Sequence, residues 1–200
     1  MKGGMRPVQA PQFYIDTAKP HLGGYIVGGD DATFFPHLWR WLVEHQGVSS
    51  VLDVGCGEGH AIDYFRDELG CYAVGIDGVP QTSPWIHETD FSQGPDTRFC
   101  ALEFDLVWSC EFVEHVEERF MQNYLTSFAQ ANLVLITHAA PDQPGHHHVN
   151  CQPALYWQGV MAAIGYHLNW DLTMLARAKS MANQSPWNHF ARSGLAFVRL

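Results

Sequence analysis

The sequence predicts an α/β protein built on a doubly wound, mostly parallel sheet. Three observations support this fold class. Short apolar runs alternate along the chain with segments whose apolar residues recur at helical spacing, and this alternation is typical of parallel sheets. Several of the apolar runs end in an acidic residue. A turn that contains three glycines follows the first run and directly precedes a helical segment.

The composition is that of one compact folding unit. Of the 200 residues, 46% are hydrophobic and 16% are charged, which suits a packed core rather than a disordered chain. We therefore expect a single domain over residues 1–200, with 1–33 as an N-terminal extension or lid and 34–200 as the core. The extension is rich in Gly, Pro and Asp, and its paired glycines at 23–24 and 28–29 favour turns.

Charge and patterning exclude several classes of function. The net charge is −10 with only 11 Lys and Arg and no basic cluster, so long nucleic acid is an unsuitable partner. No apolar run reaches the length of about 18 residues that would indicate a membrane span. Residues 1–10 lack the apolar stretch of a signal peptide. The five cysteines form no C-x-x-C pair, which predicts a reducing, cytoplasmic setting. The oligomeric state is not predicted.

Four helices are expected in the chain. The first begins at Phe34, and Pro36 is tolerated in its first turn. The second ends before Gly70 and the fourth before Gly165, because glycine commonly follows the C-terminus of a helix. The expected helices cover residues 34–46, 60–69, 117–131 and 153–164.

Seven strands are expected around these helices. They cover residues 51–54, 71–77, 85–90, 104–110, 132–138, 168–175 and 194–200. No helix is expected between the last two. Acidic residues mark the ends of the first three strands, at Asp53, Asp77 and Asp90. Because ligands of open α/β sheets bind at the carboxyl ends of the strands, these three carboxylates should converge on one crevice.

The stretch Val51-Leu-Asp-Val-Gly-Cys-Gly-Glu-Gly59 predicts a nucleotide-type pocket. Its three glycines tolerate positive φ and admit a ligand against bare backbone. The helix that follows supplies unpaired N–H groups above the turn. A dinucleotide-binding turn, G-x-G-x-x-G, would need glycine where this chain has His60. The carboxylate of Asp53 also suits a cationic ligand better than a diphosphate.

This stretch resembles motif I of the class I S-adenosylmethionine (SAM)-dependent methyltransferases. The resemblance covers about residues 50–165 and is to small single-domain enzymes of bacterial or phage type. It implies SAM as the methyl donor, and a sheet whose last strand is antiparallel. It also implies that Asp77 binds the ribose hydroxyls and that Asp90 with Phe91 meets the adenine. The implied cofactor-binding residues are Asp53, Gly55, Cys56, Gly57, Gly59, His60, Asp77, Gly78, Asp90, Phe91, Cys110 and Glu111. The alternative is a glycine-rich turn in an ordinary α/β protein.

A second polar cluster follows the fourth strand, where Glu111, Glu114 and His115 occupy positions i, i+3 and i+4. This spacing predicts one face of a helical turn, on which a divalent ion would relieve the repulsion between the carboxylates. The E-x-x-E-H pattern resembles the metal-binding segment of ubiquinone-pathway O-methyltransferases and of small-RNA 3′-terminal 2′-O-methyltransferases. In the latter, a histidine after the fifth strand completes the site, and His147 is the best match. The implied ligands of Mg²⁺ or Mn²⁺ are then Glu111, Glu114, His115 and His147. The alternative is a Glu–His pair that binds no metal.

The expected function is transfer of a methyl group from SAM to a hydroxyl group of a small molecule, with a sugar or glycan precursor as the candidate acceptor. An imidazole with a pKa near 6.5 can remove the hydroxyl proton. The expected catalytic residues are His147, His148, His115 and Glu111. The acceptor pocket would be formed by residues 23–33, 139–150 and 176–192.

Three alternatives to this function stay open. A methyltransferase for the 2′-hydroxyl at the 3′ end of RNA fits the E-x-x-E-H pattern, but the acidic charge of the chain opposes it. A SAM-binding protein without transfer activity is the second alternative. A nicotinamide-dependent enzyme is the third, and binding of NADH instead of SAM would indicate it.

Overall fold

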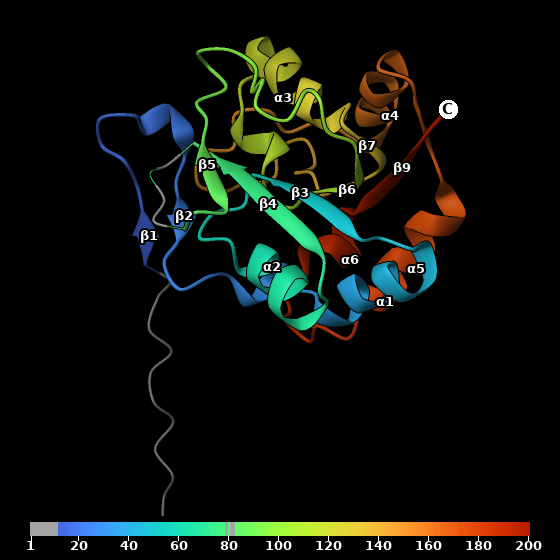
Figure 1. Ribbon diagram of the computed structural model, residues 1–200. Coiled ribbons are helices and arrows are strands. Elements are labelled where there is room, and N and C mark those ends of the chain that lie inside the picture. The colour runs from blue at the N-terminus through green and yellow to red at the C-terminus, as the bar shows by residue number, and fades with distance from the viewer. Residues whose placement is uncertain (1–11, 79, 81–82) are drawn as a thin grey trace, which may run out of the picture.

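A seven-stranded sheet forms the centre of the molecule (Figure 1), as seen in a computed structural model that describes residues 12–78, 80 and 83–200. The strand order is β5-β4-β3-β6-β7-β9-β8. The strands are β3 (Ser50–Val54), β4 (Tyr72–Asp77), β5 (Ile86–Glu88), β6 (Phe104–Ser109), β7 (Ala131–Ile136), β8 (Tyr166–Leu168) and β9 (Leu195–Arg199). Strands β3 to β7 pair in parallel, whereas β9 is antiparallel to both of its neighbours. The predicted fold class is confirmed, including the antiparallel last strand.

Helices cover both faces of this sheet (Figure 1). The first face carries α1 (Pro36–Gln46), α2 (His60–Asp63), α5 (Trp170–Ser180) and α6 (His189–Ser193), and the second carries α3 (Met121–Phe128) and α4 (Ala154–Ala163). Successive residues of β3 face opposite layers, so that Val51 packs in one apolar cluster and Leu52 in the other. Apart from Ser50 and Asp53, β3 is therefore apolar on both of its faces, as expected for a central parallel strand of a sheet that is buried on both sides.

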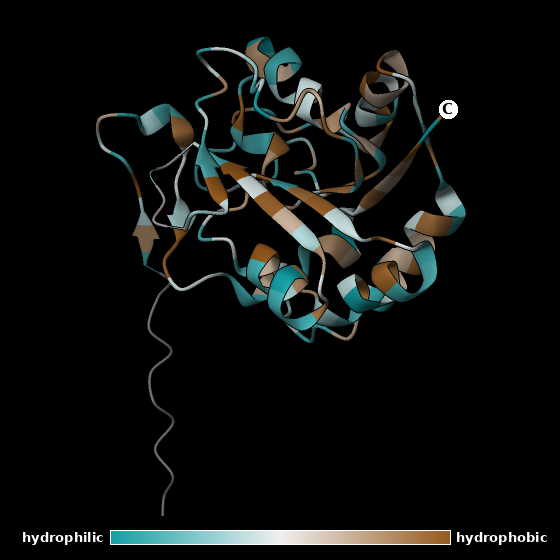
Figure 2. Ribbon diagram, in the orientation of Figure 1, coloured by the Kyte–Doolittle hydropathy of each residue, from teal (hydrophilic) through white to brown (hydrophobic). Residues whose placement is uncertain are grey.

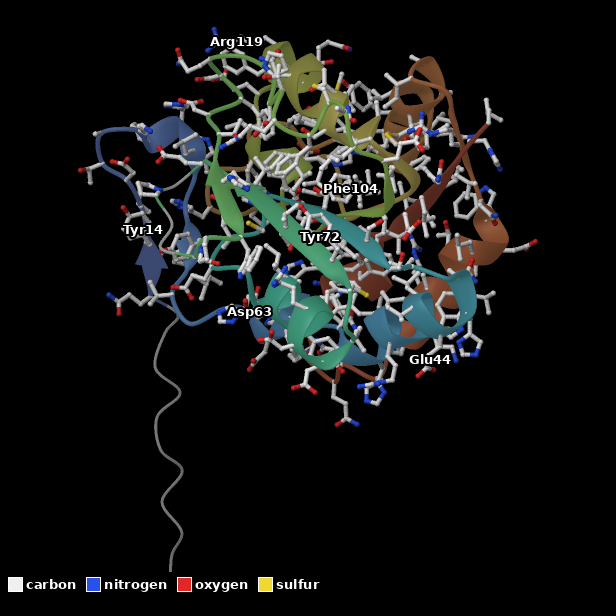
Figure 3. All side chains as sticks on the ribbon, viewed as in Figure 1. Tyr14, Glu44, Asp63, Tyr72, Phe104 and Arg119 are labelled. Carbon is white, nitrogen blue, oxygen red and sulfur yellow. The ribbon has the colours of Figure 1, made fainter. Side chains whose placement is uncertain are left out.

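The outer surfaces of the helices are polar. Figure 2 shows hydrophilic residues along the outward sides of α1 and α2. Glu44 of α1 and Asp63 of α2 are exposed and point away from the sheet (Figure 3). The helices thus bury an apolar stripe and leave a charged one in water, which is the pattern of amphipathic helices in a globular protein.

The predicted strand at 168–175 is wrong. Strand β8 ends at Leu168, and the chain turns there into α5 because the side chain of Asn169 accepts a hydrogen bond from Leu172 N at 2.9 Å. An asparagine in this position is a helix N-cap. Leu172 and Ala176, one helical turn apart, then face the core. Helices α5 and α6 consequently lie between β8 and β9, where no helix was predicted.

Several other predicted elements are shorter than expected. The third strand, predicted over 85–90, is only Ile86–Glu88. The helix predicted over 117–131 is a 3₁₀ turn, Glu118–Phe120, followed by α3, and the chain has already entered β7 at Ala131. The helix predicted over 60–69 consists of α2 and a π-helical turn, Tyr64–Glu68. In each case the type of element is confirmed and its ends are corrected.

The N-terminal segment folds back over the carboxyl ends of the strands. It contains a small antiparallel pair, β1 (Phe13–Tyr14) and β2 (Tyr25–Ile26), and short 3₁₀ turns at Pro20–Leu22 and Asp31–Thr33. The first part of the predicted lid, together with the stretch that was judged not to be a signal peptide, lies outside the described residues. Among the helices of residues 12–78, 80 and 83–200, none combines the length and the apolarity that crossing a bilayer requires.

Asp105 connects β6 to the start of β3, and we expect its removal to destabilise the protein. Its Oδ2 accepts hydrogen bonds from the backbone N and the hydroxyl of both Ser49 and Ser50, at 2.7–3.0 Å. Asp105→Ala should lower the free energy of unfolding by about 1–3 kcal/mol at pH 7, as measured by urea denaturation. The exposed Asp67→Ala variant is the control.

The difference in stability between the wild type and Asp105→Ala should depend on pH, because the Asp105 carboxylate titrates. Burial alone would raise the pKa of Asp105, but the hydrogen bonds from Ser49 and Ser50 lower it below its ordinary value. The ionised Asp105 carboxylate therefore contributes fully to the free energy of unfolding above the unfolded-state pKa of about 3.9. This contribution is lost as the pH falls through the lower folded-state pKa. We expect the wild-type and variant stabilities to converge as the pH is lowered toward 3. A difference that stays constant over that range would contradict this assignment.

Candidate functional site

A cavity of about 520 Å³ opens at the carboxyl ends of β3, β4 and β6, a size that is typical of small-molecule sites. The N-terminal segment 21–34 contributes much of its opposite wall. The predicted cofactor residues that line it are Asp53, Gly55, Cys56, Gly57, His60, Asp77, Gly78, Asp90, Phe91, Cys110 and Glu111. Gly59 of the predicted set does not line it. It lies behind the turn, where an added Cβ would meet the side chain of Ile86 at 2.6 Å.

The glycine turn after β3 adopts the backbone conformation that its sequence predicts. Gly55, Gly57 and Gly59 all have positive φ, at 81°, 52° and 85°, where a side chain would be strained. The turn is held to β4, because Gly55 N donates to Ile76 O at 2.8 Å and Gly57 N donates to Asp77 Oδ2 at 2.8 Å. The carboxylate of Asp77 therefore positions the turn as well as facing the cavity.

Two of the three strand-end carboxylates lie together at the base of this turn. Asp53 is buried, and burial followed by the negative charge of Asp77 raises the pKa of Asp53 well above its ordinary value. A cationic group bound beside these two residues would favour the ionised form of Asp53 and relieve their repulsion. This end of the cavity is therefore electrostatically suited to a positively charged ligand.

The third carboxylate, Asp90, lies where the N-terminal segment meets the core. Its Oδ2 is 2.9 Å from His21 Nε2, and its Oδ1 accepts a hydrogen bond from Ser92 N at 2.9 Å. Burial alone would raise the pKa of Asp90, but the hydrogen bonds from Ser92 and His21 lower it. The neighbouring Phe91 is buried and packs edge-on against Phe112, with ring centroids 5.9 Å apart.

Asp77→Ala tests the cofactor side of the cavity directly. Removing this carboxylate frees Gly57 N and takes away the group implied to bind the ribose, so we expect SAM binding to weaken by about 1–3 kcal/mol. Isothermal titration calorimetry measures the change, with Asp67→Ala as the control at an exposed position. Unchanged SAM affinity in Asp77→Ala would place the ribose elsewhere.

The E-x-x-E-H segment does not form the regular helical turn predicted for it. Glu111 has a φ of 54°, in the left-handed region, and only Val113–His115 forms a short 3₁₀ turn. The side chains of Glu111 and Glu114 consequently do not share one helical face, although their carboxyl groups stay in contact: burial, then the charge of Glu111 and a hydrogen bond with it, raise the pKa of Glu114. The prediction of a single face that presents all three groups is wrong.

Glu111 belongs to a hydrogen-bonded group at the cavity wall. Its Oε1 accepts a hydrogen bond from Thr137 Oγ1 at 3.1 Å, and its Oε2 lies 3.0 Å from His189 Nδ1. Burial alone would raise the pKa of Glu111, but the hydrogen bond and the charge of His189 lower it. Burial lowers the pKa of His189, while the hydrogen bond from its side chain to Glu111 raises it, and the net direction is upward.

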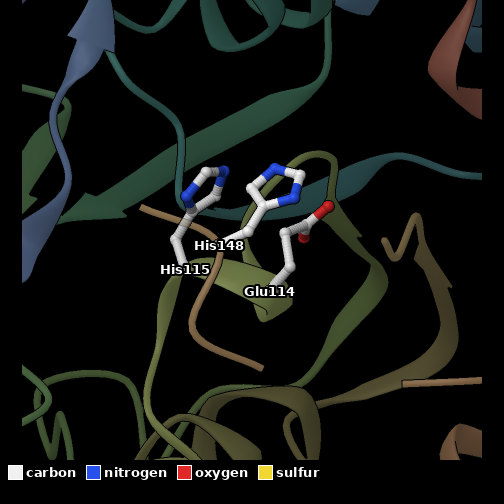
Figure 4. Close-up of side chains that lie close together, drawn as sticks. All are labelled: Glu114, His115 and His148. Carbon is white, nitrogen blue, oxygen red and sulfur yellow. The ribbon is translucent and has the colours of Figure 1, made fainter. Parts of the chain in front are cut away.

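A second group combines Glu114, His115 and His148 (Figure 4). Each offers one ligand atom, and these atoms lie within 4.8 Å of one another. The rings of His115 and His148 have centroids 5.1 Å apart and meet edge to face. Two members of the predicted metal set lie outside this group: Glu111 contacts His189, and His147 points to the N-terminal segment, where its Nε2 is 3.0 Å from His21 O.

Burial dominates the electrostatics of this second group. Both carboxyl oxygens of Glu114 are buried and accept no hydrogen bond from a donor in the described part of the chain. Burial, followed by the charge of Glu111, raises the pKa of Glu114 well above its ordinary value. Burial and the neighbouring His148 lower the pKa of His115 to about 4. The group thus contains an imidazole that is neutral at physiological pH beside a buried carboxyl whose charged neighbour, Glu111, is also negative.

Three of the four predicted catalytic residues line the cavity, namely His115, His148 and Glu111, whereas His147 does not. Two residues in the wall had no predicted role of their own. His189 and Asp30 were predicted only as members of the segments 176–192 and 23–33 that would form the acceptor pocket. Their Nε2 and Oδ2 atoms are 3.8 Å apart. No local spacing connects either residue to Glu111, so the sequence carried no signal for this grouping.

A doubly wound sheet with a glycine turn and acidic strand ends around one cavity defines an enzyme that binds a SAM-type cofactor. A family model described as "Methyltransferase domain" matches residues 33–187. The chain belongs to this methyltransferase family, and it is a class I SAM-dependent methyltransferase, as the resemblance implied. No protein among the curated sequences matches it.

Solved structures share the fold at low sequence identity. The sugar N-methyltransferase KedS8 from Streptoalloteichus sp. ATCC 53650 is 15% identical, with a TM-score of 0.60 over 100% of this chain and 98% of that one. Magnesium protoporphyrin IX methyltransferase (ChlM) from Synechocystis PCC 6803 with bound SAM is 14% identical, with a TM-score of 0.53 over 82% of this chain and 76% of that one. The methyltransferase domain of bacterial CtHen1-C is 13% identical, with a TM-score of 0.51 over 82% and 97%. These similarities establish the fold alone.

Proposed function

We propose that this enzyme transfers the methyl group of SAM to a hydroxyl group of a small molecule such as a sugar or a glycan precursor. One observation carries the proposal: a single cavity is lined both by the glycine turn after β3 and by Glu111, His115 and His148. The first set suits the methyl donor, and the second places carboxylate and imidazole groups where an acceptor would lie. The N-terminal segment 21–34 is proposed as the lid that excludes water from between them.

The cofactor side is proposed to follow the order of the strands. Asp53 and the glycine turn receive the cationic methionine part of SAM, Asp77 receives the ribose, and Asp90 with Phe91 receives the adenine. This order agrees with the burial of Asp53 and with the apolar wall that Phe91 forms beside Asp90. Holding donor and acceptor in line supplies much of the rate, because well-oriented reactions can gain about 7–11 kcal/mol from positioning.

Glu114, His115 and His148 are the proposed ligands of a divalent metal ion. The fit rests on the buried carboxyl of Glu114, whose two oxygens accept no hydrogen bond from a donor in the described residues and which lies close to the carboxyl of Glu111, since a cation would compensate both its burial and this repulsion. Two imidazoles and one carboxylate suit Mn²⁺ better than Mg²⁺, which prefers oxygen ligands. When bound, such an ion supplies Lewis acidity that eases the loss of a hydroxyl proton.

Removal of Glu114 tests the metal proposal. We expect wild-type protein to bind MnCl₂ saturably, and Glu114→Gln to weaken that binding at least about tenfold because the anionic ligand is lost. Calorimetric titration measures both, with Glu44→Gln as the exposed control. We also expect EDTA to lower methyl transfer by the wild type and Mn²⁺ to restore it. Equal Mn²⁺ binding by both proteins, or full activity in EDTA, would refute the metal site.

The charge of the cavity favours a small acceptor over RNA. Its described lining residues include several carboxylates, among them Asp30, Asp31 and Glu117, and contain neither Lys nor Arg. RNA binding relies on cations that neutralise phosphates, so these walls would repel the 3′ end of a strand. A metal ion at Glu114, His115 and His148 is the feature that favours the RNA alternative.

We also propose, from the free cysteines of the chain, that the enzyme acts in the cytoplasm.

An acceptor panel with methyl-labelled SAM distinguishes these functions. Hydroxylated small molecules, chiefly free and glycosidically linked sugars, should accept label, whereas short RNA with a free 3′ end should not. Label only on RNA would establish the RNA alternative instead. Saturable SAM binding by calorimetry without transfer to any acceptor would favour the non-catalytic SAM-binding protein. Binding of NADH instead of SAM would overturn the proposed function altogether.

A further inference from the structure

We infer that His189 is the base that removes the proton from the acceptor hydroxyl, and that Glu111 orients its imidazole for this step. The inference rests on the proposed function and deepens it by assigning a catalytic residue on the acceptor side. The motifs of the chain do not point to His189, which lies far from the E-x-x-E-H segment in the sequence. It is the fold that places His189 in the cavity wall beside Glu111.

His189 is held firmly by its neighbours on both sides. The side chain of Asn188 accepts a hydrogen bond from Ala191 N at 2.8 Å and donates to Ser180 O at 2.7 Å, which joins α6 to the end of α5. On the other side, Phe190 is fully buried and stacks on Trp108, with ring centroids 5.2 Å apart. The backbone of α6 is therefore anchored in the core, and the imidazole of His189 starts from a rigid support.

The two ring nitrogens of His189 have different surroundings. Nδ1 lies 3.0 Å from Glu111 Oε2, within hydrogen-bond distance, and Glu111 is itself fixed by Thr137. Nε2 lies 3.8 Å from Asp30 Oδ2, which is beyond hydrogen-bond distance. A carboxylate that accepts from Nδ1–H selects the tautomer whose Nε2 lone pair is free to take a proton. This is the arrangement by which a carboxylate orients a histidine base in hydrolases.

Other histidines at this end of the cavity are less suited to the role. His115 Nδ1 is 3.2 Å from His147 O, and His148 Nδ1 is 3.1 Å from Gln143 O, so backbone carbonyls rather than a carboxylate orient them. Both also belong to the proposed metal group. The charged groups that act on His189 are Glu111, Asp30 and Arg192, and the two carboxylates strengthen it as a base while Arg192 and burial weaken it.

The proton and electron balance of the step is complete without a further reactant. His189 Nε2 accepts the proton of the acceptor hydroxyl. The freed electron pair of the oxygen forms the new bond to the methyl carbon, and the bond from that carbon to sulfur breaks with its electron pair remaining on sulfur. The products are a methyl ether, S-adenosylhomocysteine and the protonated imidazole, which Glu111 stabilises until it releases its proton to water.

The tautomer of His189 tests the inference without an acceptor. Long-range ¹H–¹⁵N spectra of histidine-labelled wild type, recorded at a pH where the ring is neutral, should show the Nδ1–H form, and His189→Asn assigns the signal by its absence. Glu111→Gln should shift the tautomer balance because an amide orients the ring less strongly than a carboxylate does. A neutral Nε2–H form in the wild type would overturn the inference.

Activity separates the catalytic role from a structural one. His189→Asn retains a donor near Nδ1 but removes Nε2, so we expect methyl transfer to fall by about 100-fold or more while SAM affinity stays within about twofold. His167→Asn, at an exposed position of β8, should retain full activity. Full activity of His189→Asn with an active wild type would refute the base but leave the proposed function standing. If the wild type methylates no acceptor, the proposed function fails, and the tautomer still decides whether Glu111 orients His189.

Discussion

Gly55→Ala is expected to abolish tight SAM binding. Gly55 has a φ of 81°, and an added Cβ would meet the ring of Phe112 at 2.4 Å. The backbone conformation alone costs about 1–3 kcal/mol for a residue with a side chain, and the ring must also move out of the cavity wall. Together these effects should weaken binding at least about 100-fold, which is roughly 3 kcal/mol. Calorimetric titration with SAM measures the loss.

Gly47→Ala is the matched control for this prediction. Gly47 also has a positive φ, 72°, but nothing lies within 4 Å of its added Cβ, and it follows α1 away from the cavity. It should therefore lose some stability and retain SAM affinity. Equal affinities of Gly55→Ala and wild type would show that the turn after β3 does not contact the cofactor.

Of the proposed substitutions, Trp108→Ala is expected to lower the free energy of unfolding the most. Trp108 is 2% exposed and contacts the rings of Phe35, Trp39 and Phe190. Replacing a large buried aromatic residue by alanine costs about 3–5 kcal/mol, a large part of the total stability of a typical domain. Urea denaturation measures the free energy of unfolding.

Trp170→Ala is the matched control, because Trp170 is 54% exposed at the start of α5. We expect its effect to remain near the small values of surface substitutions. The two substitutions should also differ in their effect on methyl transfer, because the loss of Trp108 removes the ring on which Phe190 stacks and so loosens the neighbouring His189. Methyl transfer by Trp108→Ala, measured at a temperature where it is folded, should fall more than SAM affinity does. If Trp108→Ala is as stable as Trp170→Ala, the packing described for this cluster is wrong.

Most of the fold was predictable because its signals are local. The apolar run before Gly55 and the positive-φ glycines after it lie within a few residues of one another, so strand, turn and helix follow from their spacing. The segment after Leu168 was mispredicted for a related reason. Its apolar residues suit either a strand or a helix, and the side chain of Asn169, which caps α5, decided the outcome.

The acceptor side was less predictable because its groups come from distant parts of the chain. The E-x-x-E-H segment was found as a motif, yet the left-handed backbone at Glu111 interrupts the helical turn, so that Glu111 pairs with His189 while Glu114 lies with His115 and His148. The conformation of the loop 139–150 also decides which member of the histidine run 146–148 lies beside Glu114. His147 has a φ of 53° and turns toward the N-terminal segment, so that His148, and not the predicted His147, lies beside Glu114.

The sequence by itself determined the fold class, the methyl donor and the edge of the sheet where the cavity opens. The fold class and the sheet edge rest on strand ends and a glycine turn, whose geometry follows from neighbouring residues, and the methyl donor is implied by the resemblance of that turn to motif I of the class I methyltransferases. Only the tertiary structure decided how the carboxylates are used, with Glu111 beside His189 and Glu114 beside His115 and His148. The physical reason is that hydrogen bonding and burial between distant segments depend on how α6, the histidine loop and the N-terminal segment pack, and no local spacing encodes that packing.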